Sequence, residues 1–83
     1  MLRFLRERET RHHTGTGRSA HYSAVQRGLL PPPVKIGPRA SAWIDAEIDA
    51  VVRARAAGQT DDQIKELVRK LVAERATLAP VIG

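Results

Sequence analysis

Basic side chains in the first half of the chain have residue types and spacing suited to binding an anion. Arg18 and Arg27 stand nine residues apart, which corresponds to about 13 Å along a helix. Lys35 and Arg39 lie on either side of a Gly-Pro pair. Arginine can contact guanine O6 and N7 with two hydrogen bonds or pair with phosphate, whereas lysine acts as a point charge on phosphate. These residues predict an anionic partner.

The distribution of charge favours the same prediction. The 83-residue chain carries 14 Lys and Arg against 9 Asp and Glu, a net charge of +5 with its three histidines neutral. Residues 1–40 hold eight basic and two acidic residues, whereas residues 41–83 hold six basic and seven acidic residues. The excess positive charge therefore lies in the first half, which indicates a nucleic acid or an acidic membrane surface as partner. A solvated basic tail is the alternative.

Length and composition exclude several classes of protein. A chain of this size forms one small domain at most, because it buries a modest fraction of its surface. The absence of cysteine excludes a disulfide framework and a thiolate metal site. No stretch approaches the roughly 20 apolar residues of a membrane span. Arg3 and Arg6 interrupt the first apolar run, so we expect no secretory signal there. We expect a cytoplasmic, nucleoid-associated protein without enzymatic activity, metal or cofactor, because no catalytic or metal-ligand spacing is present.

Glycine and proline mark the limits of the elements that carry the basic residues. Residues 6–13 are nearly all polar, so a helix there needs support from its neighbours. A Gly-rich turn at residues 14–17 precedes a short helix over residues 18–27, which Gly28 ends. Residues 1–5 are too short a segment to assign to a helix or a strand.

Three consecutive prolines separate this helix from a predicted hairpin. Pro31–Pro33 cannot lie inside a helix, because proline lacks the amide donor and clashes with the preceding turn. Residues 34–36 and 41–43 then alternate as short strands on either side of a turn at residues 37–40. Lys35 and Arg39 would lie at or near this turn, and Trp43 is more typical of a core residue than of a binding residue.

Two amphipathic helices are predicted in the second half. Asp45 is the expected N-cap of the first, which ends at Gly58, and Thr60 with Gln63 has the capping-box spacing that begins the second. An apolar stripe follows at helical spacing, formed by Ile64, Leu67, Val68, Leu71 and Val72. The stripe either closes the core or pairs with another copy of the chain, and the apolar residues Leu78, Val81 and Ile82 favour an interface.

The order of these elements is that of a winged helix-turn-helix: a mainly α fold with a short β-hairpin wing and an additional C-terminal helix. Within it, three runs resemble the AlpA family of small phage-derived regulators, which is related to excisionases and to the DNA-binding domain of the MerR type. The runs are Arg18-Ser19-x-x-Tyr22, Gly28-Leu29-Leu30-Pro31-x-Pro33-Val34-Lys35-Ile36-Gly37-Pro38-Arg39-Ala40, and Trp43 with Glu47-Ile48. The resemblance covers residues 3 to about 55, and Arg3-Phe4-Leu5-Arg6 fits the opening of the family.

This resemblance implies a regulator of transcription in a prophage or mobile element that binds double-stranded DNA through a recognition helix and a wing. The predicted DNA-binding residues are Arg18, Ser19, His21, Tyr22, Arg27, Lys35 and Arg39. For Tyr22, packing with a solvated hydroxyl is an equal alternative to a phosphate contact. Residues 1–57 form the predicted DNA-binding domain, and residues 58–83 form an amphipathic helix and tail that closes the core or mediates oligomerisation.

Two further functions are compatible with the sequence. An excisionase, or recombination directionality factor, shares the fold and bends DNA to organise an integrase complex. In either DNA-binding role, we expect the protein to act as a dimer or a cooperative array on DNA, because one copy presents a small surface. An antitoxin-like adaptor would instead bind a protein through Leu67 and Leu71 and would have no affinity for DNA at physiological salt. DNA binding measured at several salt concentrations separates the adaptor from the other two functions.

Polar residues replace apolar residues of the family pattern in the first half, and this generates a prediction about its stability. Glu7, Thr10, Thr16 and His21 stand at such positions, and each apolar side chain no longer buried costs about 1–3 kcal/mol. We therefore expect residues 7–25 to be loosely ordered until DNA or a partner binds. Amide hydrogen exchange on the free protein measures this directly, and strong protection throughout residues 7–25 would contradict it.

Overall fold

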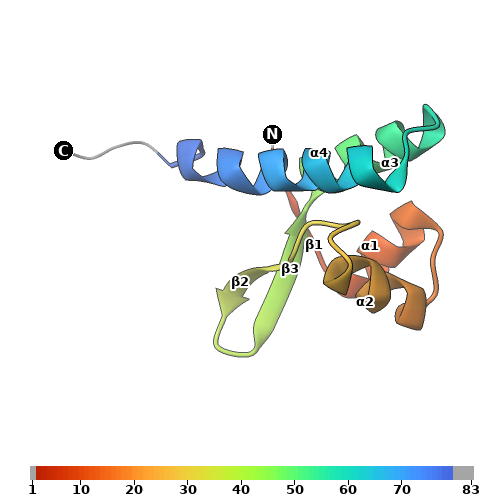
Figure 1. Ribbon diagram of the computed structural model, residues 1–83. Coiled ribbons are helices and arrows are strands. Elements are labelled where there is room, and N and C mark those ends of the chain that lie inside the picture. The colour runs from red at the N-terminus through yellow and green to blue at the C-terminus, as the bar shows by residue number, and fades with distance from the viewer. Residues whose placement is uncertain (1, 80–83) are drawn as a thin grey trace.

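Helices and a small sheet follow one another in the predicted order (Figure 1). The computed structural model describes residues 2–79, so the predicted apolar residues Val81 and Ile82 lie outside the described part of the chain. The elements are β1 (Phe4–Leu5), α1 (Glu7–Thr14), α2 (Arg18–Gln26), β2 (Val34–Gly37), β3 (Ala40–Ile44), α3 (Asp45–Ala56), α4 (Asp61–Glu74) and a 3-10 turn, η1 (Arg75–Thr77). The fold is a small, mainly helical winged helix-turn-helix with an additional C-terminal helix, which confirms the predicted class.

The helices lie on two sides of the sheet region. In Figure 1, α4 runs along one side of the molecule beside α3, whereas the β2–β3 hairpin and the pair α1 and α2 extend toward the opposite side. Within residues 2–79, no helix is both long enough and apolar enough to cross a membrane. The hairpin therefore projects away from α4, whereas the C-terminal end of α2 lies beside the first residue of α4.

The sheet has three antiparallel strands in the order β1-β3-β2. The hairpin strands β2 and β3 were predicted, and an irregularity between Lys35 and Gly37 shifts their register near the turn. Strand β1 was not predicted, because two residues carry no alternating pattern. It forms because Phe4 pairs with Ile44 and Leu5 with Trp43, on the free edge of the central strand.

The ends of the helices show one correction and one confirmation. Ile44 is the N-cap of α3, and Asp45, predicted to be that cap, is its first residue. The Asp45 carboxylate accepts hydrogen bonds from the amides of Arg3 (2.9 Å) and Ala46 (2.8 Å), so it joins β1 to α3. At α4, the Thr60 hydroxyl accepts from the Gln63 amide at 3.2 Å, and the Gln63 side chain accepts from the Thr60 amide at 2.8 Å, which confirms the capping box.

One hydrophobic core joins both halves of the chain. Its buried residues are Leu5, Leu29, Leu30, Trp43, Ile48, Val51, Ala54, Ile64 and Val68. Trp43 lies in this core, as predicted, and its indole Nε1 donates a hydrogen bond to the Pro31 carbonyl at 2.9 Å. The segment of three prolines is therefore fixed against β3.

Polar helix α1 and helix α2 are attached to this core in different ways. Helix α1 packs against α3, and its one fully buried residue, Thr10, donates its hydroxyl to the Arg6 carbonyl at 3.0 Å. Helix α2 ends at its C-cap residue Arg27, and the next residue, Gly28, has a left-handed φ of 76°, as expected from its position after the helix. The buried residue of α2 is His21.

A mostly buried ion pair joins η1 to the rest of the fold. The Arg75 guanidinium donates to both carboxylate oxygens of Glu47, from Nε at 2.8 Å and from Nη2 at 2.6 Å, and Nη2 also donates to the Pro32 carbonyl at 2.8 Å. The Glu47 side chain is 7% exposed and the Arg75 side chain 21%. The hydrogen bonds to Glu47 raise the pKa of Arg75. Helix α3, the proline segment and the C-terminal helix therefore meet at one guanidinium.

We predict that Arg75→Met lowers the free energy of unfolding by about 3 kcal/mol, because the carboxylate of Glu47 stays buried without its partner. Urea denaturation measures the loss. Arg53→Met is the matched control, since its ion pair with Asp49 is exposed on both sides and its removal costs about 0.5 kcal/mol. Equal losses in the two variants would contradict the structural role of Arg75.

His21 has an unusual environment for an ionisable side chain. It is 0% exposed, and neither ring nitrogen has a hydrogen-bond partner among the described residues. Its ring packs edge-on against Trp43, with centroids 4.7 Å apart, and against Tyr22 at 5.1 Å. Burial lowers the pKa of His21; the positive charge of Arg11 acts in the same direction, and the negative charge of Glu7 opposes it. The folded protein therefore favours the neutral imidazole.

We predict that His21 makes the protein less stable in acid. Because its pKa is lower in the folded state, the unfolded chain binds a proton at this residue more readily as the pH falls through about 6.5, so stability falls with it. Wild type should therefore be less stable at about pH 5.5 than at about pH 7.5 through this residue. In urea titrations at the two pH values, His21→Leu should abolish this difference, and His12→Leu, at an exposed position, should retain it. A pH dependence unchanged by His21→Leu would contradict the prediction.

Candidate nucleic-acid interface

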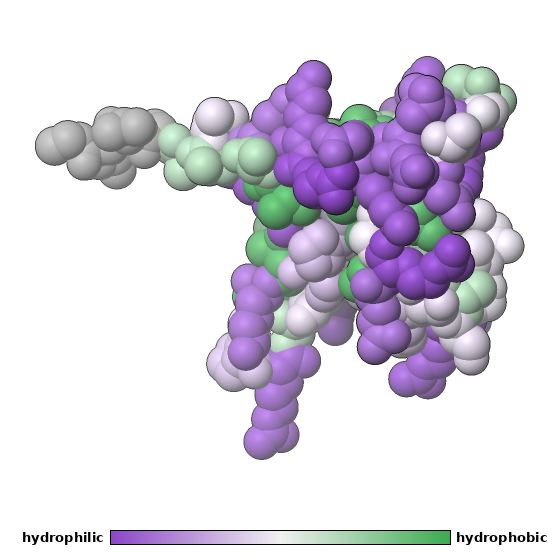
Figure 2. Space-filling view, viewed as in Figure 1, coloured by the Kyte–Doolittle hydropathy of each residue, from purple (hydrophilic) through white to green (hydrophobic). Residues whose placement is uncertain are grey.

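The hairpin presents two of the predicted basic residues to solvent. Lys35 lies on β2 and Arg39 in the turn that follows it, and both are exposed. Neither forms an ion pair with another of the described residues 2–79. Figure 2 shows hydrophilic side chains projecting from this hairpin, away from the body of the protein. The wing therefore carries positive charge that no carboxylate of the described chain neutralises.

Helix α2 exposes most of the predicted recognition residues. Arg18, Ser19, Tyr22 and Arg27 are all exposed, with Arg27 at the C-cap of the helix. His21, which was predicted to contact DNA, is fully buried. A buried imidazole cannot reach a groove, so we correct His21 from a DNA-binding residue to a core residue between α2 and β3. The sequence placed His21 in the short helix predicted over residues 18–27, where its burial against Trp43 could not be recognised.

The N-terminus of α2 has no side-chain cap. Gly17 occupies the N-cap position and offers no side-chain acceptor. The first amides of a helix have no partner within the helix, and together with the helix dipole they favour an anion. Ser19 lies in this first turn and is exposed. This end of α2 is suited to a phosphate.

Glu7 of α1 connects the two helices of the helix-turn-helix. Its Oε2 accepts the hydroxyl proton of Tyr22 at 2.8 Å, and its Oε1 accepts from Nε of Arg11 at 2.8 Å. The Arg18 Nε lies 3.9 Å from Oε2. The Tyr22 hydrogen bond lowers the pKa of Glu7, with further contributions from Arg11 and Arg18, and the same bond raises the pKa of Tyr22. Glu7 therefore stays ionised and Tyr22 stays protonated at neutral pH.

The other end of α2 has a similar arrangement. Asp61, the first residue of α4, lies with Oδ2 3.6 Å from Nη2 of Arg27 and accepts from Nη1 of Arg55 at 2.8 Å. The hydrogen bond from Arg55 lowers the pKa of Asp61. Each end of α2 is therefore next to a carboxylate from another helix. The contacts of Glu7 and Asp61 with the ends of α2 could not be predicted from the sequence, because both depend on how the helices pack.

The predicted oligomerisation stripe on α4 divides into two groups. Ile64 and Val68 are buried in the core described above, whereas Leu67, Leu71 and Val72 are partly buried against it. Leu78 is 53% exposed and lines a small groove with Leu2, Phe4 and Ile44. Most of the stripe therefore faces the protein's own core.

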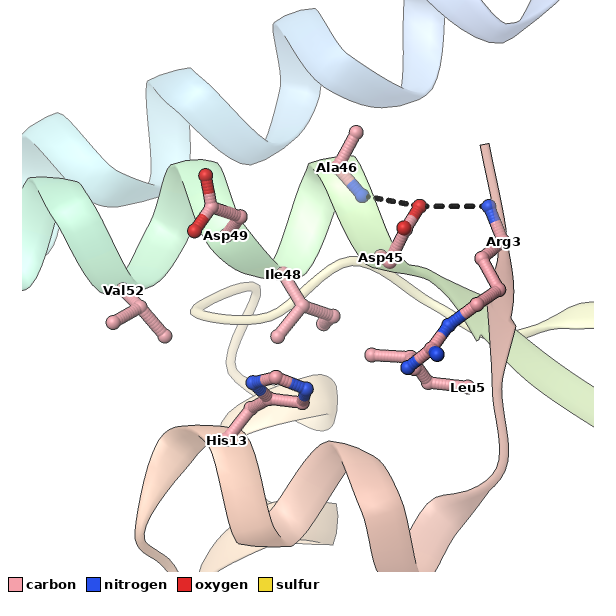
Figure 3. Close-up of a pocket in the computed structure, with 8 residues that line it drawn as sticks. All are labelled: Arg3, Leu5, His13, Asp45, Ala46, Ile48, Asp49 and Val52. Atoms are coloured by element: carbon pink, nitrogen blue, oxygen red, sulfur yellow. Dashed lines mark hydrogen bonds between the residues drawn. The ribbon is translucent and has the colours of Figure 1, made fainter. Parts of the chain in front are cut away.

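A cavity of about 300 Å³ opens between α1 and α3 (Figure 3). Its apolar lining is formed by Leu5, Ile48 and Val52, and His13 of α1 and Asp49 of α3 lie on opposite sides of it. In the described part of the chain, no group of three or more His, Cys, Asp or Glu side chains is placed to hold a metal ion. The exposed basic residues of α2 and the hairpin are the stronger candidate site.

Two comparisons with known proteins show what this chain is similar to. Residues 3–56 match the family described as prophage CP4-57 regulatory protein (AlpA), a range that runs from β1 to the end of α3. The chain is also 39% identical over 57 residues to the uncharacterized protein ORF88 of Enterobacteria phage P4. That match covers 69% of this chain and 65% of the phage protein. No solved structure matches the chain.

The matched range contains the helix-turn-helix, the wing and Trp43, and it ends before α4. These are the segments whose residues carried the resemblance found in the sequence. The chain belongs to the AlpA family of prophage regulatory proteins.

Proposed function

We propose that this protein binds double-stranded DNA sequence-specifically and regulates transcription of a prophage or mobile element. The observation that carries the proposal is the placement of α2 and the hairpin, which project to the same side of the molecule and expose Arg18, Arg27, Lys35 and Arg39. In winged helix-turn-helix proteins, the second helix enters the major groove, and basic residues fix the register on the phosphates.

The proposed contacts differ along this surface. Arg18, with a side chain 75% exposed, reads a base edge or a phosphate at the start of α2, and Ser19 donates to a phosphate near the free amides. Arg27 contacts the backbone at the other end of the helix. Lys35 and Arg39 contact the phosphates that flank the recognised groove.

We propose that residues 58–83 act mainly by completing the fold of residues 1–57. Ile64 and Val68 are buried in the core of the first segment, and Arg75 binds Glu47. The adaptor function requires Leu67 and Leu71 to be free for another protein, and both are partly buried against this core. An interface between copies would be left with Leu67, Leu71 and Val72.

The proposed DNA binding raises two further points, the number of copies bound to DNA and the excisionase role. A single copy presents a small surface to DNA, so two copies on tandem or inverted sites would provide the affinity of a regulator. The excisionase role would use the same α2 and wing contacts and would add DNA bending and an integrase contact. Two measurements distinguish the excisionase from the transcriptional regulator. One is DNA bending, measured with the binding site at several positions in a fragment, and the other is binding to an integrase.

We predict that Arg39→Ala weakens binding to every duplex and makes binding less salt-dependent. Loss of one phosphate contact should reduce the slope of log K against log salt by about 0.9. Fluorescence anisotropy between about 50 and 200 mM salt measures the slope on a random duplex and on one selected from a random pool. A slope unchanged by Arg39→Ala would contradict the wing assignment.

Two variants complete this test. Arg18→Ala should reduce the preference for the selected duplex over the random one, by a factor of about 5 or more if Arg18 contacts a base. Arg53→Ala is the control, because Arg53 is exposed on α3 and paired with Asp49, and it should leave both slope and preference unchanged. Absence of any binding by wild type would overturn the proposed function.

A further inference from the structure

The hydrogen bond between Tyr22 and Glu7 determines what Tyr22 can offer to DNA. A tyrosine hydroxyl carries one proton and can also accept hydrogen bonds through its lone pairs. In this protein the proton points to Oε2 of Glu7, over a distance of 2.8 Å. The exposed side of the hydroxyl is therefore an acceptor.

The surroundings of Glu7 keep this direction fixed. An ionised carboxylate can only accept hydrogen bonds, so it cannot donate to Tyr22 in return. Arg11 binds the other carboxylate oxygen at 2.8 Å, and Arg18 lies 3.9 Å from the oxygen that Tyr22 contacts. The Glu7 side chain is 26% exposed, so it is partly shielded from solvent. The Tyr22 ring is itself held edge-on by the buried ring of His21.

This direction of the hydroxyl conflicts with a phosphate contact. Phosphate oxygens are acceptors, so Tyr22 could donate to one only by losing its bond to Glu7, and the two negative groups would then lie near each other. In the major groove, the donors are the exocyclic amino groups of adenine (N6) and cytosine (N4). A hydroxyl that accepts is complementary to such an amino group.

We propose that Tyr22 reads an exocyclic amino group of adenine or cytosine in the major groove, and that Glu7 is the positioning residue that makes Tyr22 an acceptor there. The inference rests on the proposed function, since it requires α2 to enter the groove. It assigns Tyr22 a role in sequence preference instead of the phosphate contact considered from sequence.

The experiment uses the full 83-residue chain and a duplex selected from a random pool. Each adenine of that duplex is replaced in turn by the base that lacks the N6 amino group, and each cytosine by the base that lacks the N4 amino group. At one position, loss of the amino group should weaken wild-type binding by roughly 3- to 10-fold, the effect of one neutral hydrogen bond. The position also shows whether the base is adenine or cytosine.

Tyr22→Phe tests whether this loss belongs to Tyr22. The binding of this variant to the selected, unmodified duplex should weaken by the same roughly 3- to 10-fold. Its binding to the duplex that lacks the amino group should weaken no further, as expected when both changes remove one shared interaction. The variant keeps the ring that packs on His21, and its circular dichroism spectrum and thermal midpoint show that it is folded. The salt slope should not change, because no phosphate contact is removed.

Variants of α1 test the role of Glu7. Glu7→Ala frees the hydroxyl proton of Tyr22, so the hydroxyl is no longer held as an acceptor. The variant should therefore discriminate less between the selected, unmodified duplex and the duplex that lacks the amino group. Glu9→Gln is the matched control, because Glu9 is on the same helix and its carboxylate contacts the Arg6 amide and the Arg3 side chain, not Tyr22. It should discriminate as wild type does.

The outcomes separate this inference from the proposed function. If wild type prefers no sequence over a random duplex, the proposed function is overturned, and the role of Tyr22 with it. If wild type selects a sequence, but Tyr22→Phe weakens binding to all duplexes equally and reduces the salt slope, only the present inference is overturned. Tyr22 is then a phosphate contact. A Glu7→Ala variant that is folded and discriminates as wild type does would overturn the role of Glu7.

Discussion

Burial of the Trp43 indole is the constraint on which the positions of the other elements depend. Trp43 lies on β3, the central strand, and pairs directly with Leu5 of β1. Its Nε1 holds the Pro31 carbonyl, which positions the chain entering the hairpin, and its ring contacts His21, which positions α2. The chain has one tryptophan. This one side chain therefore contacts both α2 and the segment that leads into the hairpin.

The attachments of α2 divide into apolar contacts at its middle and ionic contacts at its ends. His21 joins the helix to the core without hydrogen bonds, whereas Glu7 and Asp61 lie next to its two ends. Exposed ion pairs of this kind contribute about 0–1 kcal/mol each. They are weak enough for a phosphate to replace them at Arg18 and Arg27, yet Glu7 also binds Tyr22 and Arg11, so it is less easily displaced. The contacts of His21 thus orient α2, whereas the ion pairs of Arg18 and Arg27 are the contacts that a phosphate could replace.

Features with a local signal were predictable from sequence. The hairpin followed from alternation between turn residues, the capping box of α4 from Thr60 and Gln63, and the exposed basic residues from their charge. Strand β1 was missed because its two residues pair with a partner about 40 positions away. Burial of His21 joins α2 to β3, and the contacts of Glu7 with Tyr22 and of Arg75 with Glu47 join separate helical segments. Such contacts depend on tertiary packing, and the periodicity and spacing of residues along the sequence carry no information about it.

The contacts of Arg75 have a consequence for the order in which the fold is completed. Arg75 reaches back 28 residues to Glu47 and 43 residues to Pro32, and contacts between such distant positions form late because their loops are costly to close. During synthesis, the base of the wing and the start of α3 lack their shared cation until position 75 has left the ribosome. The contacts of the proline segment and of α3 with Arg75 therefore need a residue that lies beyond the family match.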